Sequence, residues 1–289
     1  MAHTKQRRPQ LLSSTRPRKS KPPPSLSSHT TRTLIRTHHT LRKQLSSALI
    51  SGNDVGAKDL QGQIDALGGL ARYQQASIQG QSLRRGGDTS KMLVEWLSQS
   101  AMTITPSGKS REKLRLLEVG SLRTDNACSR SGLFHVTRID LHSQHPEIKA
   151  QDFMDMPIPK AADLEQEGFD VVSLSLVVNF VSDAIERGKM LKRIEAFLRP
   201  LKPGRSRTFP ALFLVLPVAC VANSRYLDEE RLEAIMGSLG YTKVNVKTSA
   251  KLAYYLWKRE ESSEVKCRPF KKEEVRAGKT RNNFAILLH

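Results

Sequence analysis

The stretch from Leu114 to Asp140 constrains the fold more than any other part of the chain. Its first apolar run, interrupted by Glu118, stops at Gly120, and its second run stops at Asp140. A strand that ends at a glycine, followed by a strand that ends at a carboxylate, is typical of an open α/β sheet that binds a nucleotide at its carboxyl edge. Gly120 lets a ligand approach the backbone because it has no Cβ, although a plain strand-to-helix turn would also require glycine.

The residues that follow Gly120 narrow the class of ligand. Ser-Leu-Arg comes next, so the G-x-G-x-x-G pattern is missing and a phosphate cradle is not supported. Asp140, about twenty residues further on, is spaced to accept hydrogen bonds from two ribose hydroxyls. The alternative for Asp140 is an acid at the end of a strand that caps the next segment. A ligand with a ribose but no pyrophosphate fits best, and S-adenosylmethionine is the common one.

The C-terminal two thirds alternate between strand and helix patterns. The continuous apolar run 169–178 predicts a strand that is buried on both faces, as in a parallel sheet. The other segments expected there are strands at 114–119, 134–139 and 211–216, a short unit at 148–153, and helices at 183–198 and 228–239. The strand-like segments 243–246, 252–257 and 283–288 are expected to close the far side of the sheet.

The N-terminal third has a different composition. Residues 1–53 contain eleven Lys or Arg and no acid, which predicts a basic arm that is disordered at 1–28, with a basic helix from Thr31 to the stop at residues 51–53. A second helical segment, 57–83, contains the pair Gly68-Gly69, which marks a break or a close backbone contact. Asp88 is expected to cap a third helix. The predicted division is therefore arm 1–53, helical region 54–106 and α/β domain 107–289.

The overall charge predicts the kind of partner. A net charge of +19, concentrated unevenly, favours a polyanion such as nucleic acid. The three cysteines form no CxxC pair and the histidine pairs lack other metal ligands, so neither a disulfide framework nor a metal site is expected. No apolar stretch reaches the length of a membrane span and no secretory signal precedes the arm, so we expect a reducing, intracellular compartment and no membrane partner.

Several short motifs together resemble one family, over about residues 64–289. They are LGGL-x-x-YQ-x-AS-x-x-GQ (67–81), LLEVGSL (116–122), IDLHS (139–143), QDFM (151–154), SLVVNFVSD (175–183), KLAYYLW (251–257) and NNFAIL (282–287). This combination is similar to the S-adenosylmethionine-dependent adenine-N1 methyltransferases that modify 25S ribosomal RNA in fungi. The resemblance implies a Rossmann-like class I methyltransferase sheet, preceded here by a small helical region and a disordered basic arm.

The resemblance also implies roles for particular residues. Gly120 and Asp140 match the family residues expected to bind S-adenosylmethionine. In the usual arrangement of this fold, Asp152 and Phe153 lie beside the adenine of the cofactor. Asn179 and Phe180 end the fourth strand, where class I methyltransferases place the target base. A side-chain amide can recognise an adenine edge and an aromatic ring can stack on it, although Phe180 is also a candidate core residue.

The activity implied is methyl transfer to N1 of one adenine in large-subunit ribosomal RNA. The partners expected are that RNA and the pre-ribosomal particle, in the nucleus and nucleolus. A metazoan relative resembles a cofactor sensor in growth signalling, so a protein that binds S-adenosylmethionine without transferring its methyl group is the alternative. A third reading is an RNA-binding protein with a degenerate fold.

Overall fold

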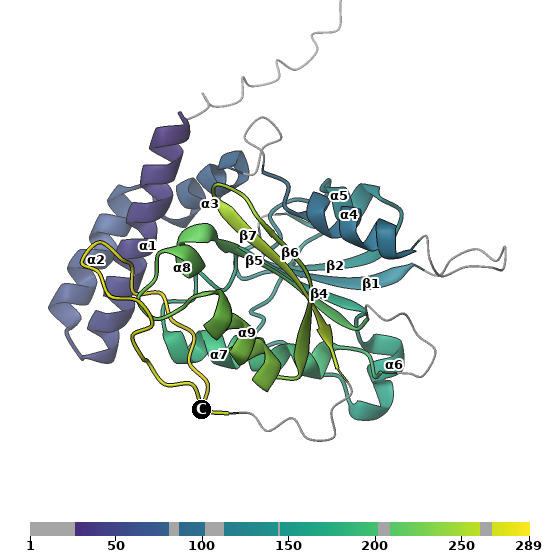
Figure 1. Ribbon diagram of the computed structural model, residues 1–289. Helices are drawn as coiled ribbons and strands as arrows, with labels where there is room; N and C mark the ends of the chain where they lie inside the picture. Colours follow the sequence, from purple (N-terminus) through teal and green to yellow (C-terminus); the bar gives the residue numbers. More distant parts are fainter. Residues whose placement is uncertain (1–26, 81–86, 102–112, 144, 202–208, 261–267) are drawn as a thin grey trace, which may run out of the picture.

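A seven-stranded sheet organises the C-terminal two thirds of the chain (Figure 1). The computed structural model describes residues 27–80, 87–101, 113–143, 145–201, 209–260 and 268–289. The strand order is β3-β2-β1-β4-β5-β7-β6. The strands are β1 (Leu114–Val119), β2 (Phe134–Asp140), β3 (Lys149–Ala150), β4 (Val171–Ser175), β5 (Ala211–Pro217), β6 (Tyr241–Thr248) and β7 (Leu252–Arg259).

The first five strands are parallel, and β7 inserts antiparallel between β5 and β6. The chain runs from β1 outward to β2 and β3, then returns to place β4 on the other side of β1. That reversal puts a topological switch point at the carboxyl ends of β1 and β4, where open α/β sheets bind ligands. The prediction of a Rossmann-like α/β sheet is confirmed.

Helices cover both faces of the sheet because neighbouring residues of each strand point to opposite sides. Leu116 packs in a cluster with α4 (Ser90–Ala101) and α5 (Ala127–Arg130), whereas Leu117 packs in a second cluster with α7 (Ala184–Arg193) and α9 (Glu229–Ser238). The shorter helices are α6 (Leu164–Glu167), α8 (Val218–Ala222) and two 3-10 turns at Ala161–Asp163 and Ile194–Phe197. Two buried faces explain the continuous apolar runs of the central strands.

Three helices precede the sheet and share a small core of their own. They are α1 (Ser28–Ile50), α2 (Asp54–Ala66) and α3 (Gly69–Gly80), and Leu41, Leu45 and Ile64 are among the buried residues between them. The predicted break is found between α2 and α3, where Gly68 has a φ of +92°. The later part of the predicted arm is therefore the helix α1, which begins at Ser28 with Ser27 as its N-cap. The rest of the predicted disorder at residues 1–28 falls on residues 1–26, outside the described residues. The domain boundaries stay predictions.

Two expectations about strands were wrong. The segment 283–288 does not join the sheet; Phe284, Ile286 and Leu288 pack instead with the cluster that covers α7 and α9. β4 is shorter than the apolar run 169–178, because Leu176 has a φ of +59° and turns the chain out of the strand. A positive φ is rare for a residue with a bulky side chain, so it marks a constrained turn at the carboxyl edge.

Candidate active site at the carboxyl edge of the sheet

The turn after β1 requires glycine at position 120. Gly120 has a φ of +71°, and its N–H donates to the carbonyl oxygen of Ile139 at 2.9 Å. A Cβ at this position would lie 2.7 Å from Cγ2 of Val177, which follows β4. The absence of a side chain thus allows β1 and the segment after β4 to approach closely, at the switch point of the sheet.

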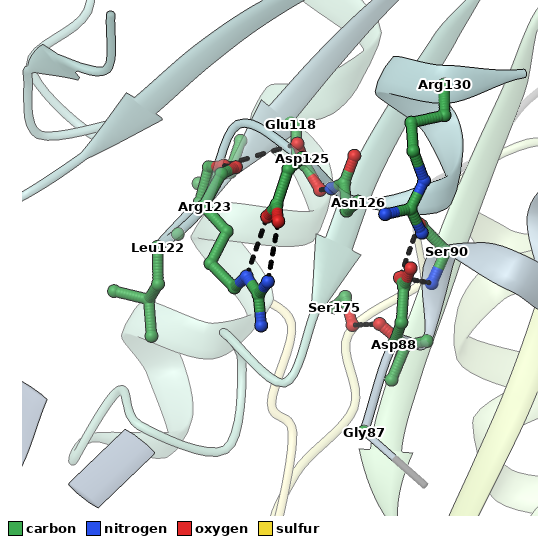
Figure 2. A pocket seen from close by; sticks show the side chains of 14 residues that line it. Gly87, Asp88, Ser90, Glu118, Leu122, Arg123, Asp125, Asn126, Arg130 and Ser175 are labelled. Carbon is green, nitrogen blue, oxygen red and sulfur yellow. Dashed lines mark hydrogen bonds and ion pairs between the residues drawn. The ribbon is translucent and has the colours of Figure 1, made fainter. Parts of the chain in front are cut away.

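A hollow opens beside this turn (Figure 2). Its cavity has a volume of about 50 Å³ and opens to solvent. Its lining comes from the segment before α4, the β1–α5 loop and the end of β4. Charged groups of both signs line it, namely Asp88, Glu118, Arg123, Asp125 and Arg130.

Glu118 is the buried acid of this hollow. Its carboxylate accepts from Nδ2 of Asn126 at 2.5 Å and from the Ser121 hydroxyl at 3.2 Å. Nε of Arg138 lies 3.8 Å away. Burial raises the pKa of Glu118 to about 7 in spite of these partners. An acid that interrupts an otherwise apolar run is a visible signal for this residue, but the sequence interpretation assigned it no role.

Asp88 ties two helix N-termini to the same hollow. Its Oδ1 accepts from the Ser90 N–H at 3.1 Å, which confirms the predicted cap of α4. Its Oδ2 accepts from the Ala127 N–H at 2.8 Å, at the start of α5. The neighbouring Thr89 shares a 2.7 Å hydrogen bond with Ser175 of β4. The region before α4 is thereby fixed to the start of α5 and to the end of β4.

Asp140 lies at the end of β2, where its carboxylate has one oxygen in a hydrogen bond and one without a partner among the described residues. Its Oδ1 accepts from the His142 N–H at 2.9 Å, so the carboxylate does cap the following turn. Oδ2 accepts no hydrogen bond from the described residues, and the side chain is half-buried. The carboxylate can therefore cap the turn and still accept from a ligand. Burial raises the pKa of Tyr73 on α3, and the charge of the Asp140 carboxylate adds to this effect.

The two candidates after β3 differ in exposure. Asp152 is half-buried, and its Oδ1 accepts from the Met154 N–H at 2.8 Å. Phe153 is only 3% exposed, and its ring lies 5.3 Å from the Phe197 ring within the core. The Phe153 side chain is thus core packing, and this residue could meet an adenine only through its backbone.

The two candidates after β4 lie under the N-terminal helices. Phe180 is 38% exposed, and its ring lies 4.0 Å from His39 of α1 and 5.9 Å from Tyr73 of α3. It is therefore not a residue of the main core, which was the alternative. Oδ1 of Asn179 is buried and has no hydrogen-bond partner among the described residues. A buried acceptor without a partner is costly, and such groups call for an explanation.

The six candidates thus lie at or after the carboxyl ends of four adjacent parallel strands, at one edge of the sheet. Of the six, only Gly120 lines the hollow of Figure 2. The sequence interpretation gave Asp88 only a capping role and assigned no role to Glu118 on the side of the hollow. It likewise assigned no site role to His39 and Tyr73, which lie on the side of Phe180. In the described part of the chain, no three His, Cys, Asp or Glu side chains group together as metal ligands. No described helix has the length and apolar character to cross a membrane.

Two solved structures align with most of the chain at low identity. A 16S rRNA methylase, RmtB, shares 13% identity at a TM-score of 0.41, covering 80% of this chain and 98% of that one. An rRNA methylase from Escherichia coli shares 10% identity at a TM-score of 0.43, covering 80% of this chain and 100% of that one. The fold assignment rests on the strand order, not on these distant likenesses.

Sequence relatives are much closer. The 25S rRNA adenine-N(1) methyltransferase of Schizosaccharomyces pombe is 40% identical over 88% of this chain and 89% of its own length. The 25S rRNA (adenine(2142)-N(1))-methyltransferase of Saccharomyces cerevisiae is 40% identical over 78% of this chain and 62% of its own length. Residues 58–286 match the family described as 25S rRNA (adenine(2142)-N(1))-methyltransferase, Bmt2. The chain therefore belongs to this family of methyltransferases.

Proposed function

We propose that the protein transfers a methyl group from S-adenosylmethionine to N1 of one adenine in large-subunit ribosomal RNA. The main support for the proposal is the placement of the candidate residues at the carboxyl edge of the sheet, in a chain that belongs to this family. There Gly120 and Asp140 lie on one side of the switch point, and Asn179 and Phe180 lie on the other. A cofactor side and a base side thus meet at the ends of β1 and β4.

The residues of the cofactor side fit S-adenosylmethionine. The hollow beside Gly120 offers carboxylates and guanidinium groups, which suit a ligand end that carries both an ammonium and a carboxylate. The unused oxygen of Asp140 suits a ribose hydroxyl. Asp152 suits the amino group of the adenine, with its neighbour Phe153 contributing backbone only. The bound cofactor would supply a methyl group already activated on a sulfonium.

The base side needs no general base, because N1 of neutral adenine carries a free lone pair. Phe180 can stack on the base, and the unpartnered Oδ1 of Asn179 can accept from its amino group. Holding the base in line and excluding water contributes up to roughly 7–11 kcal/mol in such reactions. N1 lies on the Watson–Crick edge, so the target adenine has to be unpaired or flipped out, which costs a few kcal/mol.

The charge of the chain supports RNA as the substrate. A net charge of +19 provides cations that can release counterions from phosphates, so we expect binding that weakens steeply with salt. We also propose that the protein acts on the pre-ribosomal particle in the nucleus and nucleolus. The basic residues 1–53 support this, and imaging of a tagged full-length chain tests it: exclusion from the nucleus would contradict it.

The decisive experiment incubates the protein with methyl-labelled S-adenosylmethionine and protein-free 25S rRNA. We expect label on the RNA and a reverse-transcription stop at one adenine, because N1 methylation blocks base pairing. Asp140→Ala should abolish transfer and cofactor binding while circular dichroism stays unchanged. Tight cofactor binding by the wild-type protein, with no label on RNA or on pre-ribosomal particles, would contradict the proposal. That result would support the alternative, a sensor that binds S-adenosylmethionine without transferring its methyl group.

A further inference from the structure

One face of α1 lies over the end of β4, where the proposed target base would stack. The His39 ring lies 4.0 Å from the Phe180 ring, and the His38 ring stacks on Tyr73 of α3 at 4.4 Å. Burial, followed by the nearby Lys43 and His38, lowers the pKa of His39 to about 4, so this imidazole is neutral near pH 7. An uncharged aromatic ring thus lies tilted against Phe180.

Lys43 lies one helical turn after His39, on the same face of α1. It forms no ion pair or hydrogen bond with any described residue, and the positive charge of Arg187 on α7 is close enough to repel it. Its pKa is lowered, first by burial and then by Arg187. An ammonium that lies near another cation, and that has no carboxylate partner among the described residues, gains from binding an anion.

Arg187 is fixed in place by hydrogen bonds within the chain, so its guanidinium is not free to bind a phosphate. It is 3% exposed, and its guanidinium donates to the carbonyl oxygens of Val181, Ser182 and Ala285. Its ring contact is with Phe284, at 4.3 Å. Arg187 thus acts as a fixed positive charge beside the residues that follow Phe180, while the flexible ammonium of Lys43 stays available.

We propose that this face of α1 forms the outer half of the target-nucleotide site. The adenine base displaces His39 from Phe180, and Lys43 binds the phosphate of the same nucleotide. The buried Oδ1 of Asn179, next in the chain to Phe180, then faces a base that can donate to it. The inference rests on the proposed function, because it takes the substrate to be a flipped adenosine of ribosomal RNA.

The phosphate contact is tested with Lys43→Gln and the matched variant Lys58→Gln, which removes an exposed lysine of α2. Binding of protein-free 25S rRNA is measured from 50 to 200 mM salt. We expect Lys43→Gln to weaken binding roughly tenfold and to reduce the salt slope by about 1. Lys58→Gln should match the wild type, and cofactor affinity by calorimetry should be unchanged in both. An unchanged slope and affinity in Lys43→Gln would overturn the assignment.

Displacement of His39 is tested by NMR on protein labelled at histidine. Adding S-adenosylmethionine and then an rRNA fragment that the protein methylates should shift the His39 signal, while the signal of exposed His135 on β2 stays in place. A His39 signal that stays unchanged on RNA that is bound and methylated would overturn this half of the proposal. The methylation assay on the wild-type protein distinguishes a failure of the proposed function from a failure of this inference. If the wild type does not methylate RNA, the proposed function is wrong. If the wild type methylates RNA normally and Lys43→Gln binds RNA as the wild type does, only the inference is wrong.

Discussion

Gly120 and Gly132 share a φ of +71°, but their surroundings differ. A Cβ at Gly132 meets nothing within 4 Å, whereas one at Gly120 lies 2.7 Å from Val177. Gly132→Ala should therefore cost only the left-handed backbone strain, about 1–2 kcal/mol. Gly120→Ala should lower the free energy of unfolding, measured with urea, by more than this amount. It should also weaken cofactor binding, measured by calorimetry, at least tenfold. Equal losses in the two variants would mean that the contact with Val177 does not matter.

Glu118 predicts a pH dependence of stability with a defined sign. Its pKa of about 7 in the folded protein lies above the ordinary 4.5, so the folded state holds a proton that the unfolded state has lost. The contribution of protonated Glu118 to the free energy of unfolding is complete below about pH 4.5. It disappears as the pH rises to about 7, and the free energy of unfolding then falls by about 3 kcal/mol.

Urea unfolding between pH 4.5 and 8 checks this expectation. The neutral variant Glu118→Gln lacks the titrating group, so it should gain stability relative to the wild type over this range. Glu147→Gln, at an exposed position, should follow the wild-type curve. A stability difference between Glu118→Gln and wild type that does not vary with pH would show that Glu118 has an ordinary pKa in the folded protein.

The sequence predicted the positions of residues that lie at the ends of strands, because neighbouring residues in the chain determine those positions. Gly120 follows a strand and Asp140 ends one, so their positions could be inferred from the pattern alone. The environment of Glu118 depends on Asn126 and Arg138, which come from α5's N-cap and from β2. No periodicity in the sequence records such contacts, and the same holds for Phe153, whose burial follows from packing on Phe197.

At the scale of elements, the close contact between α7 and residues 283–288 can be tested with a second matched pair of glycine variants. A Cβ at Gly188 would lie 1.8 Å from the carbonyl oxygen of Leu287, while one at Gly237 of α9 meets nothing within 4 Å. Gly188→Ala should destabilise by roughly 1–3 kcal/mol and raise hydrogen exchange in residues 283–288. Gly237→Ala should be neutral or stabilising by up to about 1 kcal/mol. Slow exchange at 283–288 in Gly188→Ala would refute the contact.

Elements with a strong apolar pattern were predicted well, and those shaped by tertiary contacts were not. β1, β2 and β5 occur within one residue of their expected bounds, and β5 is buried at every position except its last. The segment 283–288 has the same apolar pattern, yet its residues bury themselves against helices without joining the sheet. Burial alone produces the pattern, so the pattern cannot distinguish a strand from an extended segment that covers a core.

At the scale of the whole molecule, the helical region and the sheet jointly build the site. Nε2 of Gln74 on α3 donates to the His142 carbonyl oxygen at 2.7 Å, which fixes α3 to the turn that Asp140 caps. The sequence predicted both parts but not their contact, because residues 68 positions apart meet only in the folded chain. The proposed outer half of the base site, with His39 and Tyr73, could therefore be recognised only in the folded structure.

The uneven charge predicts how the whole chain binds RNA. Residues 1–26 carry Lys5, Arg7, Arg8, Arg16, Arg18, Lys19 and Lys21 and no acid. Replacing these cations by Gln should flatten the slope of log K against log salt by about 0.7–0.9 for each phosphate that the variant no longer neutralises. Cofactor affinity should not change, because the residues proposed to bind it lie elsewhere. A variant with residues 1–26 in scrambled order keeps the charge and should bind like the wild type. Weak binding by the scrambled variant would show that this segment acts through a specific sequence, not through its charge.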